Sequence, residues 1–180
     1  MRCYSFIWLL IIFLTFSCKS PFYEVKYNNS ISTVIKKGKN ESVIFSKEAD
    51  CFLCNLGVGR FTPTIQEVNG AEEILRKRIR AANNPMYNQG NGCPIIHNNL
   101  KNYRRQYYGF IDKEGNKVLF VNFIWSRYSI SDRLKGYFKD ESDDWKTQRV
   151  IVLDGCSHYW SIEVNITKNN LQNIRVNGVA

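Results

Sequence analysis

The 180-residue sequence lacks the short motifs by which several large enzyme classes are recognised. It contains no P-loop, no G-x-G-x-x-G fingerprint, no G-x-S-x-G elbow and no H-E-x-x-H zinc motif, which excludes the enzyme classes defined by those motifs. Histidine occurs only twice, and no segment has the spaced acidic pattern of a calcium loop. Internal repeats and low-complexity tracts are also absent. We therefore expect neither a bound cofactor nor a metal.

No apolar run is long enough to cross a membrane. The longest, residues 6–14 (FIWLLIIFL), falls well short of the about 20 residues that a transmembrane helix needs. Its length is typical of the apolar core of a secretory signal. Ser17 and Cys18 follow, and here the chain resembles bacterial lipoprotein precursors, which are cleaved before a cysteine that then carries lipid. The resemblance predicts a signal peptide over residues 1–17 and lipidation at Cys18. An ordinary secretory signal is the alternative.

The chain is basic, with a formal net charge of +9. Such a charge is compatible with nucleic acid, an anionic lipid surface or an acidic glycan as partner. The Lys and Arg residues are scattered along the sequence, so an ordinary solvated surface is the simplest interpretation. With the signal and the lipid, we expect a protein anchored in the bacterial cell envelope, at the outer membrane or cell surface rather than the inner membrane. Nucleic acid is not an expected partner there.

The sequence predicts two parts after the signal. Residues 18–50 are rich in Lys, Asn and Ser with little periodicity, which indicates a lipidated N-terminus and, for the most part, a polar linker, with residues 43–45 (VIF) as a candidate short strand. Residues 51–180 predict a single domain.

That domain begins with an amphipathic helix. Its N-terminal cap is either Thr62 with Pro63 or Thr64 with Glu67, and apolar residues then recur at helical spacing. The segment 83–85 (NNP) ends the helix.

Strand-like segments follow the helix. Residues 105–111 and 117–125 flank a Gly-containing loop and predict a hairpin. Residues 147–153 and 173–177 predict two further strands. Residues 158–166 (HYWSIEVNI) alternate strictly between apolar and polar side chains and predict the organising strand of the sheet.

The alternation in this organising strand predicts which of its side chains enter the core. Trp160 belongs to the apolar parity, whereas Glu163 belongs to the polar parity that we expect near water. Pairing apolar side chains across strands predicts Val150 opposite Trp160, through a loop of odd length, and Val164 opposite Ile174.

One helix followed by about five antiparallel strands predicts an α+β fold, with the amphipathic helix packed on the sheet. By analogy the arrangement resembles cystatin-like and nuclear transport factor 2-like folds. Residues 61–64 (FTPT), the hairpin sequence YGFIDKEGNKVLFVN and the final RVNGVA are similar to segments of small lipoproteins of Bacteroidetes-type bacteria. The resemblance covers residues 58–180. That family has no established activity, so the resemblance assigns no catalytic residue.

Four cysteines remain if the signal is removed and Cys18 carries lipid: Cys51, Cys54, Cys93 and Cys156. An oxidising envelope favours disulfides, and all three full pairings stay open. Cys93 lies in a segment without predicted structure and Cys156 at a predicted turn, where a cross-link would stabilise most. Their bridge would close a loop of about 60 residues. Cys51 and Cys54 can pair with each other or with distant partners.

The cysteines and histidines also allow three other roles. Cys51 and Cys54 have the spacing of a redox motif, but the glycines that follow prevent a helix from starting there. With His97 and His158 the cysteines supply zinc-ligand types at a spacing that matches no common zinc site. A nucleophilic pair of His158 with a cysteine is a third alternative. Structural disulfides, and a packing role for His158, are favoured over all three.

An acidic cluster within residues 126–146 offers carboxylates for acid–base chemistry or calcium, although a solvated turn is the preferred interpretation. Its members are Asp140, Glu141, Asp143 and Asp144.

The long loop over residues 126–146 is also the main candidate for a binding surface, because long loops in compact domains are often functional. The candidate residues in and beside it are Tyr128, Tyr137, Phe138, Trp145, Tyr103 and Arg105. We expect a non-catalytic binding or interaction module with a protein or glycan partner. The alternative is a small envelope enzyme that uses Cys/His or acidic-loop carboxylate chemistry.

Overall fold

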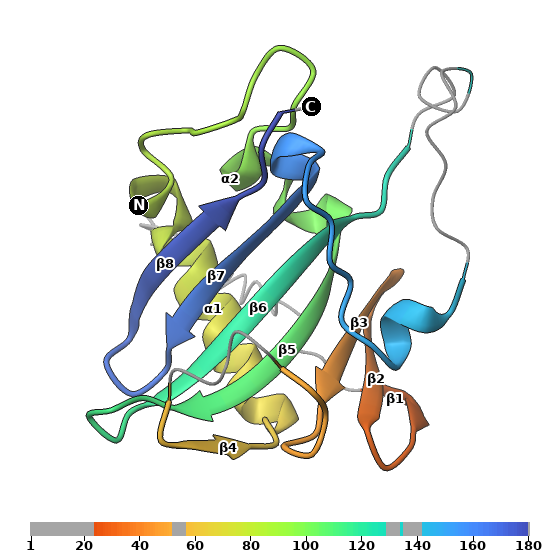
Figure 1. The fold of residues 1–180 in the computed structure, drawn as a ribbon, viewed down its shortest axis with the longest axis vertical. Coiled ribbons are helices and arrows are strands. Elements are labelled where there is room, and N and C mark those ends of the chain that lie inside the picture. Colours follow the sequence, from red (N-terminus) through yellow and green to blue (C-terminus); the bar gives the residue numbers. More distant parts are fainter. Residues whose placement is uncertain (1–23, 52–56, 129–133, 135–141, 180) are drawn as a thin grey trace, which may run out of the picture.

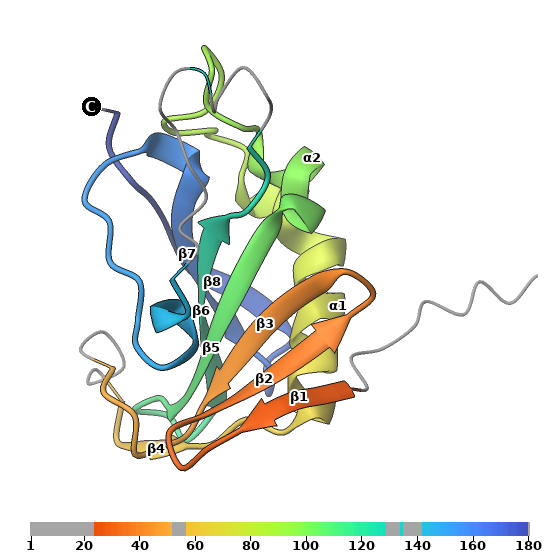
Figure 2. The ribbon, with the colours of Figure 1, turned by 90° about the vertical axis from the view of Figure 1, so that its right-hand side faces the viewer.

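The structure is a computed structural model that describes residues 24–51, 57–128, 134 and 142–179. One large sheet carries the helix α1 across one face, and an extended segment crosses the other face (Figures 1 and 2). In chain order the elements are β1 (Glu24–Asn28), β2 (Ser32–Lys37), β3 (Asn40–Phe45), β4 (Gly59–Phe61), α1 (Ile65–Ala82), α2 (Ile96–Asn99), the 3₁₀ turn η2 (Leu100–Asn102), β5 (Tyr103–Ile111), β6 (Lys117–Trp125), η3 (Asp144–Lys146), η4 (Cys156–His158), β7 (Tyr159–Asn165) and β8 (Asn170–Val176).

The sheet has eight strands, with the order β1-β2-β3-β5-β6-β7-β8 and with β4 paired to β5 beside β3. All pairs are antiparallel except β3 with β5, which is parallel. The predicted α+β class, with a largely antiparallel sheet, is therefore confirmed. The prediction of about five strands is wrong, because the described part of the chain contains eight.

The additional strands come mainly from the segment that we predicted to be a polar linker. Residues 24–45 form β1, β2 and β3, so the linker prediction is wrong there. The apolar side chains of this segment are few, but Ile35 and Ile44 are buried under α1, and Val34, Val43 and Phe45 are buried on the opposite face. Because apolar side chains are buried on both faces of these strands, a short Lys- and Asn-rich segment can form part of the sheet.

The helix α1 matches its sequence signals. Thr64 caps it: the Thr64 hydroxyl accepts a hydrogen bond from the Glu67 N–H at 3.2 Å, and the Glu67 carboxylate accepts from the Thr64 N–H at 2.9 Å. This is the capping box predicted for Thr64 and Glu67. The buried stripe of Val68, Ala71, Ile74, Leu75 and Ile79 packs against the sheet.

The hairpin of β5 and β6 is confirmed. Asp112 organises its turn, because its carboxylate accepts hydrogen bonds from the N–H groups of Glu114 and Asn116 at 2.9 and 2.8 Å. Gly115 adopts a φ of +84°, which favours glycine.

The organising strand is β7, and the side chains that we predicted for its core face are buried under α1. Trp160 stacks on Phe123 with ring centroids 3.8 Å apart, and Ile162 and Val164 are fully buried. The prediction that its polar face lies near water is wrong. Glu163 is only 5% exposed, because side chains of β8 meet it: Gln172 and Asn173 donate hydrogen bonds to its carboxylate, and Arg175 forms an ion pair with it.

Residues 147–153 do not form a strand, so that prediction is wrong. They belong to a crossing segment, residues 144–155, which runs over the face of the sheet opposite α1 (Figure 1). Two buried amides hold it there. Gln106 Nε2 donates to the carbonyls of Trp145 and Gln148 at 2.7 and 2.8 Å, and Asn122 Nδ2 donates to the carbonyl of Val150 at 2.9 Å. Hydrogen bonds from these two side chains therefore take the place of the backbone hydrogen bonds that would join this segment to a neighbouring strand.

The predicted cross-strand partners of Trp160 and Val164 on β7 are also wrong. Trp160 pairs with Phe123 on β6 and with Val176 on β8, not with Val150. Val164 pairs with Leu171 rather than Ile174, because the β7–β8 turn is formed by residues 166–169 and sets Asn165 opposite Asn170.

Candidate functional site

The described residues of the predicted binding surface do not form one exposed aromatic patch. Tyr103, Arg105 and Trp145 are 1%, 6% and 2% exposed, so they are core residues. Tyr128 is half-buried, and its hydroxyl lies 3.5 Å from that of Tyr159. Tyr137 and Phe138 lie outside the described residues.

Arg105 is buried because it joins the sheet to α1. Its guanidinium donates hydrogen bonds to the carbonyls of Tyr103 and Leu100 at 2.9 and 3.0 Å, and its Nε lies 2.8 Å from the Glu72 carboxylate. Tyr107 donates to the same carboxylate at 3.0 Å. Burial acts to lower the pKa of Arg105, but the Glu72 carboxylate outweighs it and the pKa is raised. This cluster is structural, since breaking a buried ion pair is strongly destabilising.

The cysteines are partly resolved. Cys93 and Cys156 form a disulfide between the loop after α1 and η4, the turn that precedes β7. It is the bridge that we considered most stabilising. Cys51 is buried and also disulfide-bonded, whereas Cys18 and Cys54 lie outside the described residues. Because the sulfurs of Cys93 and Cys156 are bonded to each other, they cannot serve as zinc ligands.

Among the described residues, the histidines and carboxylates that we singled out do not gather into one site. His97 Nδ1 lies 3.1 Å from the amide of Asn83, and His158 Nδ1 lies 3.1 Å from the carbonyl of Gly155. Asp143 is exposed and pairs with Lys146. Asp140 and Glu141 lie outside the described residues. Within the part of the chain that the structure describes, no group of three His, Cys, Asp or Glu side chains is arranged to hold a metal ion.

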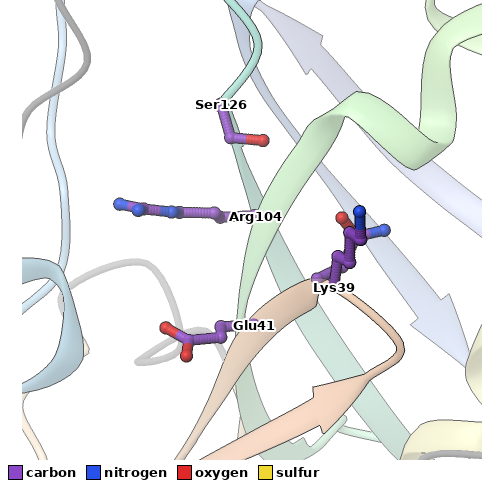
Figure 3. A pocket seen from close by; sticks show the side chains of 5 residues that line it. Lys39, Glu41, Arg104 and Ser126 are labelled. Atoms are coloured by element: carbon purple, nitrogen blue, oxygen red, sulfur yellow. The ribbon is translucent and has the colours of Figure 1, made fainter.

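The site that the structure does assemble is a polar hollow of about 340 Å³ at the end of the sheet where β3 begins and β6 ends (Figure 3). Its lining residues are Lys39, Asn40, Glu41, Arg104 and Ser126. They come from the β2–β3 turn, from the start of β3, from β5 and from the residue after β6. Figure 3 shows Glu41 and Arg104 leaving neighbouring strands in the same direction.

The backbone fixes the lining residues from the β2–β3 hairpin. Lys37 pairs with Asn40, and Gly38 adopts a φ of +59° in the tight turn between them, where a glycine costs least. Lys39 is therefore exposed at the turn, and Asn40 donates a hydrogen bond to the Lys101 carbonyl at 3.2 Å. Glu41 follows on β3 and forms an ion pair with Lys26 of β1.

Two further contacts hold the opposite wall of the hollow. The Arg104 guanidinium lies 4.6 Å from the ring centroid of Trp145, a cation–π arrangement that limits its motion. Ser126 donates its hydroxyl hydrogen to the Asn102 carbonyl at 2.8 Å. Trp145, predicted as a binding-surface residue, is buried and contributes to the hollow by positioning Arg104.

The hollow lies in a basic surface, which we define as Lys26, Lys36, Lys39, Arg104 and Lys146. Lys36 lies opposite Glu41 in the hairpin, and the Lys146 ammonium lies 5.9 Å from the Trp145 ring centroid. The hydrogen bond from Lys26, together with the charges of Lys146 and Arg104, keeps the pKa of Glu41 below its ordinary value. Glu41 is therefore ionised at neutral pH. Of the described carboxylates, Glu41 and Asp143 pair with this surface, so its net charge is positive.

Sequence reasoning missed this site because the five basic residues are scattered through 120 residues of sequence and converge only in the sheet. The cluster of lysines around Gly38 was the one local signal. It was visible in the sequence, but the segment was interpreted as linker.

A comparison with known proteins gives no matching family model, no matching curated protein and no matching solved structure. In the residues that the structure describes, no helix has the length and apolar character needed to span a membrane.

Proposed function

We propose that the protein is a non-catalytic binding module of a bacterial cell envelope, tethered by a lipid on Cys18, which binds an anionic partner at the polar hollow and the basic surface around it. The single observation behind the proposal is that Lys26 of β1, Arg104 of β5 and Lys146 of the crossing segment all act on the Glu41 carboxylate at the hollow.

The charges of the recess support an anionic partner. The Lys39 ammonium has no carboxylate within ion-pair distance among the described residues. Arg104 presents a planar guanidinium, which suits the fork geometry of a carboxylate, sulfate or phosphate group. Because the hollow is open to solvent, each charged contact is screened by salt and contributes modestly, about 1 kcal/mol.

The binding proposal is tested by measuring the affinity of the soluble domain for a polyanion at several salt concentrations. Arg104→Gln and Lys39→Gln should each weaken binding roughly fivefold, which corresponds to about 1 kcal/mol. Lys113→Gln is the matched control, because Lys113 is exposed in the hairpin turn at the opposite end of β6 and its loss changes net charge equally. If all three substitutions weaken binding equally, the affinity depends on the net charge of the protein and not on the residues of the hollow.

The lipid tether has its own test. Metabolic labelling with a radioactive fatty acid should mark the native protein and not a Cys18→Ala variant. Label that persists in Cys18→Ala would refute the tether and leave the binding proposal standing.

A further inference from the structure

The disulfide between Cys93 and Cys156 has a histidine beside one of its two sulfurs. His158 Nδ1 lies 3.4 Å from Cys156 Sγ and 3.1 Å from the Gly155 carbonyl oxygen. Because a carbonyl oxygen can only accept, Nδ1 carries the hydrogen, and the same N–H lies within hydrogen-bond distance of the sulfur. The Trp125 ring meets the imidazole edge to face at 5.3 Å, which limits the rotation of the imidazole.

The two sulfurs of the bridge also differ in their access to solvent. Cys156 is only 4% exposed, whereas Cys93 is half-buried in the loop after α1. In thiol–disulfide exchange a thiolate attacks one sulfur of the bridge while the other sulfur leaves, and the reaction is faster when the leaving thiolate is stabilised. Here the accessible sulfur is that of Cys93, and the sulfur with a neighbouring N–H donor is that of Cys156. The bridge is therefore arranged for attack in one direction.

Other contacts hold the two bridged segments together when the disulfide is open. The Ser157 hydroxyl donates a hydrogen bond to the Pro94 carbonyl at 2.5 Å, and so joins the residues that follow each cysteine. The Tyr103 hydroxyl donates to the Ser157 carbonyl at 2.7 Å, and Tyr103 is buried in the core. After the bridge opens, the sulfurs of Cys93 and Cys156 thus remain near each other and can form the bond again.

We propose that this bridge is an exchangeable disulfide at which Cys93 is modified by a thiol of low molecular weight. The thiolate of that molecule attacks Cys93 Sγ, a bond forms between these two sulfurs, and the bond from Cys93 to Cys156 breaks. Its electron pair leaves with Cys156 Sγ, and the new thiolate accepts the hydrogen bond from His158 Nδ1–H. In the reverse step the Cys156 thiolate attacks Cys93 Sγ and expels the thiol, so neither direction needs a further oxidant or reductant. Neither the polar hollow nor the lipid tether takes part in this chemistry.

The first test identifies the sulfur that is attacked. The folded protein is incubated with reduced glutathione, quenched with excess N-ethylmaleimide and digested for mass spectrometry. Glutathione on the Cys93 peptide with maleimide on the Cys156 peptide should be in roughly tenfold or greater excess over the opposite arrangement. In urea that unfolds the protein, the two arrangements should become comparable. The same excess in urea would mean that the local sequence, and not the fold, selects Cys93, which would overturn the proposal.

The role of His158 is tested by two substitutions and a control. His158→Leu removes the N–H donor and should slow formation of the Cys93 adduct roughly tenfold, because the leaving thiolate loses its hydrogen bond. His158→Asn places an amide N–H near the position of Nδ1 and should restore most of the rate. The matched control is His97→Asn. His97 is the other histidine of the sequence and contacts the amide of Asn83 instead of a sulfur, so its replacement should not slow the reaction.

Thermal melting of each variant shows whether it is folded, and the site of attack is measured on the native chain, so the proposal stays testable if His158→Leu fails to fold. Glutathione on Cys156, or no adduct until urea unfolds the protein, would refute the exchange site. The assignment to His158 fails if His158→Leu reacts as fast as the native protein, if His158→Asn is as slow as His158→Leu, or if His97→Asn is slowed equally.

Discussion

The crossing segment should detach from the sheet when Gln106 is replaced by leucine. Gln106 is fully buried and its side chain makes four hydrogen bonds. Its Nε2 donates to the carbonyls of Trp145 and Gln148, and its Oε1 accepts from Asn122 Nδ2 at 2.9 Å and from the Val150 N–H at 3.0 Å. Leucine has nearly the same volume, so the substitution tests the hydrogen bonds and not the packing.

The magnitude follows from these four bonds. A net value of about 0.5–1.5 kcal/mol for each gives a range of roughly 2–6 kcal/mol. The Gln148 carbonyl belongs to an exposed residue and can bond to water instead, which places the expected loss near the middle of that range, at about 3 kcal/mol. Gln172→Leu on β8 is the control. Gln172 makes one side-chain hydrogen bond, to Glu163 at 3.2 Å, so its replacement should cost under about 1 kcal/mol.

Two measurements check this expectation. Urea melts should show a lower midpoint for Gln106→Leu with an unchanged slope, which is the mark of altered stability without altered exposed surface. Hydrogen exchange should show that the Val150 amide loses protection, because Gln106 Oε1 is its acceptor, while amides of the β5–β6 ladder exchange no faster than global unfolding allows. An unchanged Val150 amide, or equal losses of stability in Gln106→Leu and Gln172→Leu, would refute the role that we assign to Gln106.

Three further predictions concern the disulfide, β7 and Glu41. Replacing both Cys93 and Cys156 by alanine should cost about 4 kcal/mol on the chain-entropy model for a separation of 63 residues, seen as a lower melting temperature; an unchanged melting temperature would contradict this. Glu163→Ala should cost about 2–3 kcal/mol of stability, because the carboxylate is buried and accepts hydrogen bonds from Gln172 and Asn173. Urea melts measure this cost, and a loss below about 0.5 kcal/mol, the usual limit for a surface substitution, would contradict the burial of Glu163. The pKa of Glu41 is lowered in the folded state by the hydrogen bond from Lys26, so its contribution to stability is present above its ordinary value of 4.5 and is lost as the pH falls through the lower folded value. Glu41→Gln should therefore flatten the dependence of stability on pH in that acidic range, and an unaltered acidic limb would argue against the ion pair.

Local sequence signals predicted α1 and the β5–β6 hairpin well. The capping box at Thr64 and Glu67 and the 3.6-residue spacing of apolar side chains involve residues within one or two turns of each other, so their physical cause is contained in the segment itself. The turn at Asp112 and Gly115 is equally local. The bridge between Cys93 and Cys156 was among the pairings considered, but only the fold selected it.

What the tertiary structure alone decided depends on contacts between distant segments. Residues 24–45 became strands because β5 offered a parallel partner to β3 and because both faces of β2 and β3 are covered, neither of which their own composition reveals. Residues 147–153 have strand composition, yet the buried amides of Gln106 and Asn122 satisfy their backbone groups from the face of the sheet. The burial of Glu163 and the assembly of the polar hollow likewise depend on contacts between segments that are distant in the sequence. Hydrogen bonding and burial are properties of a position in space, and the sequence specifies that position only through the complete set of long-range contacts.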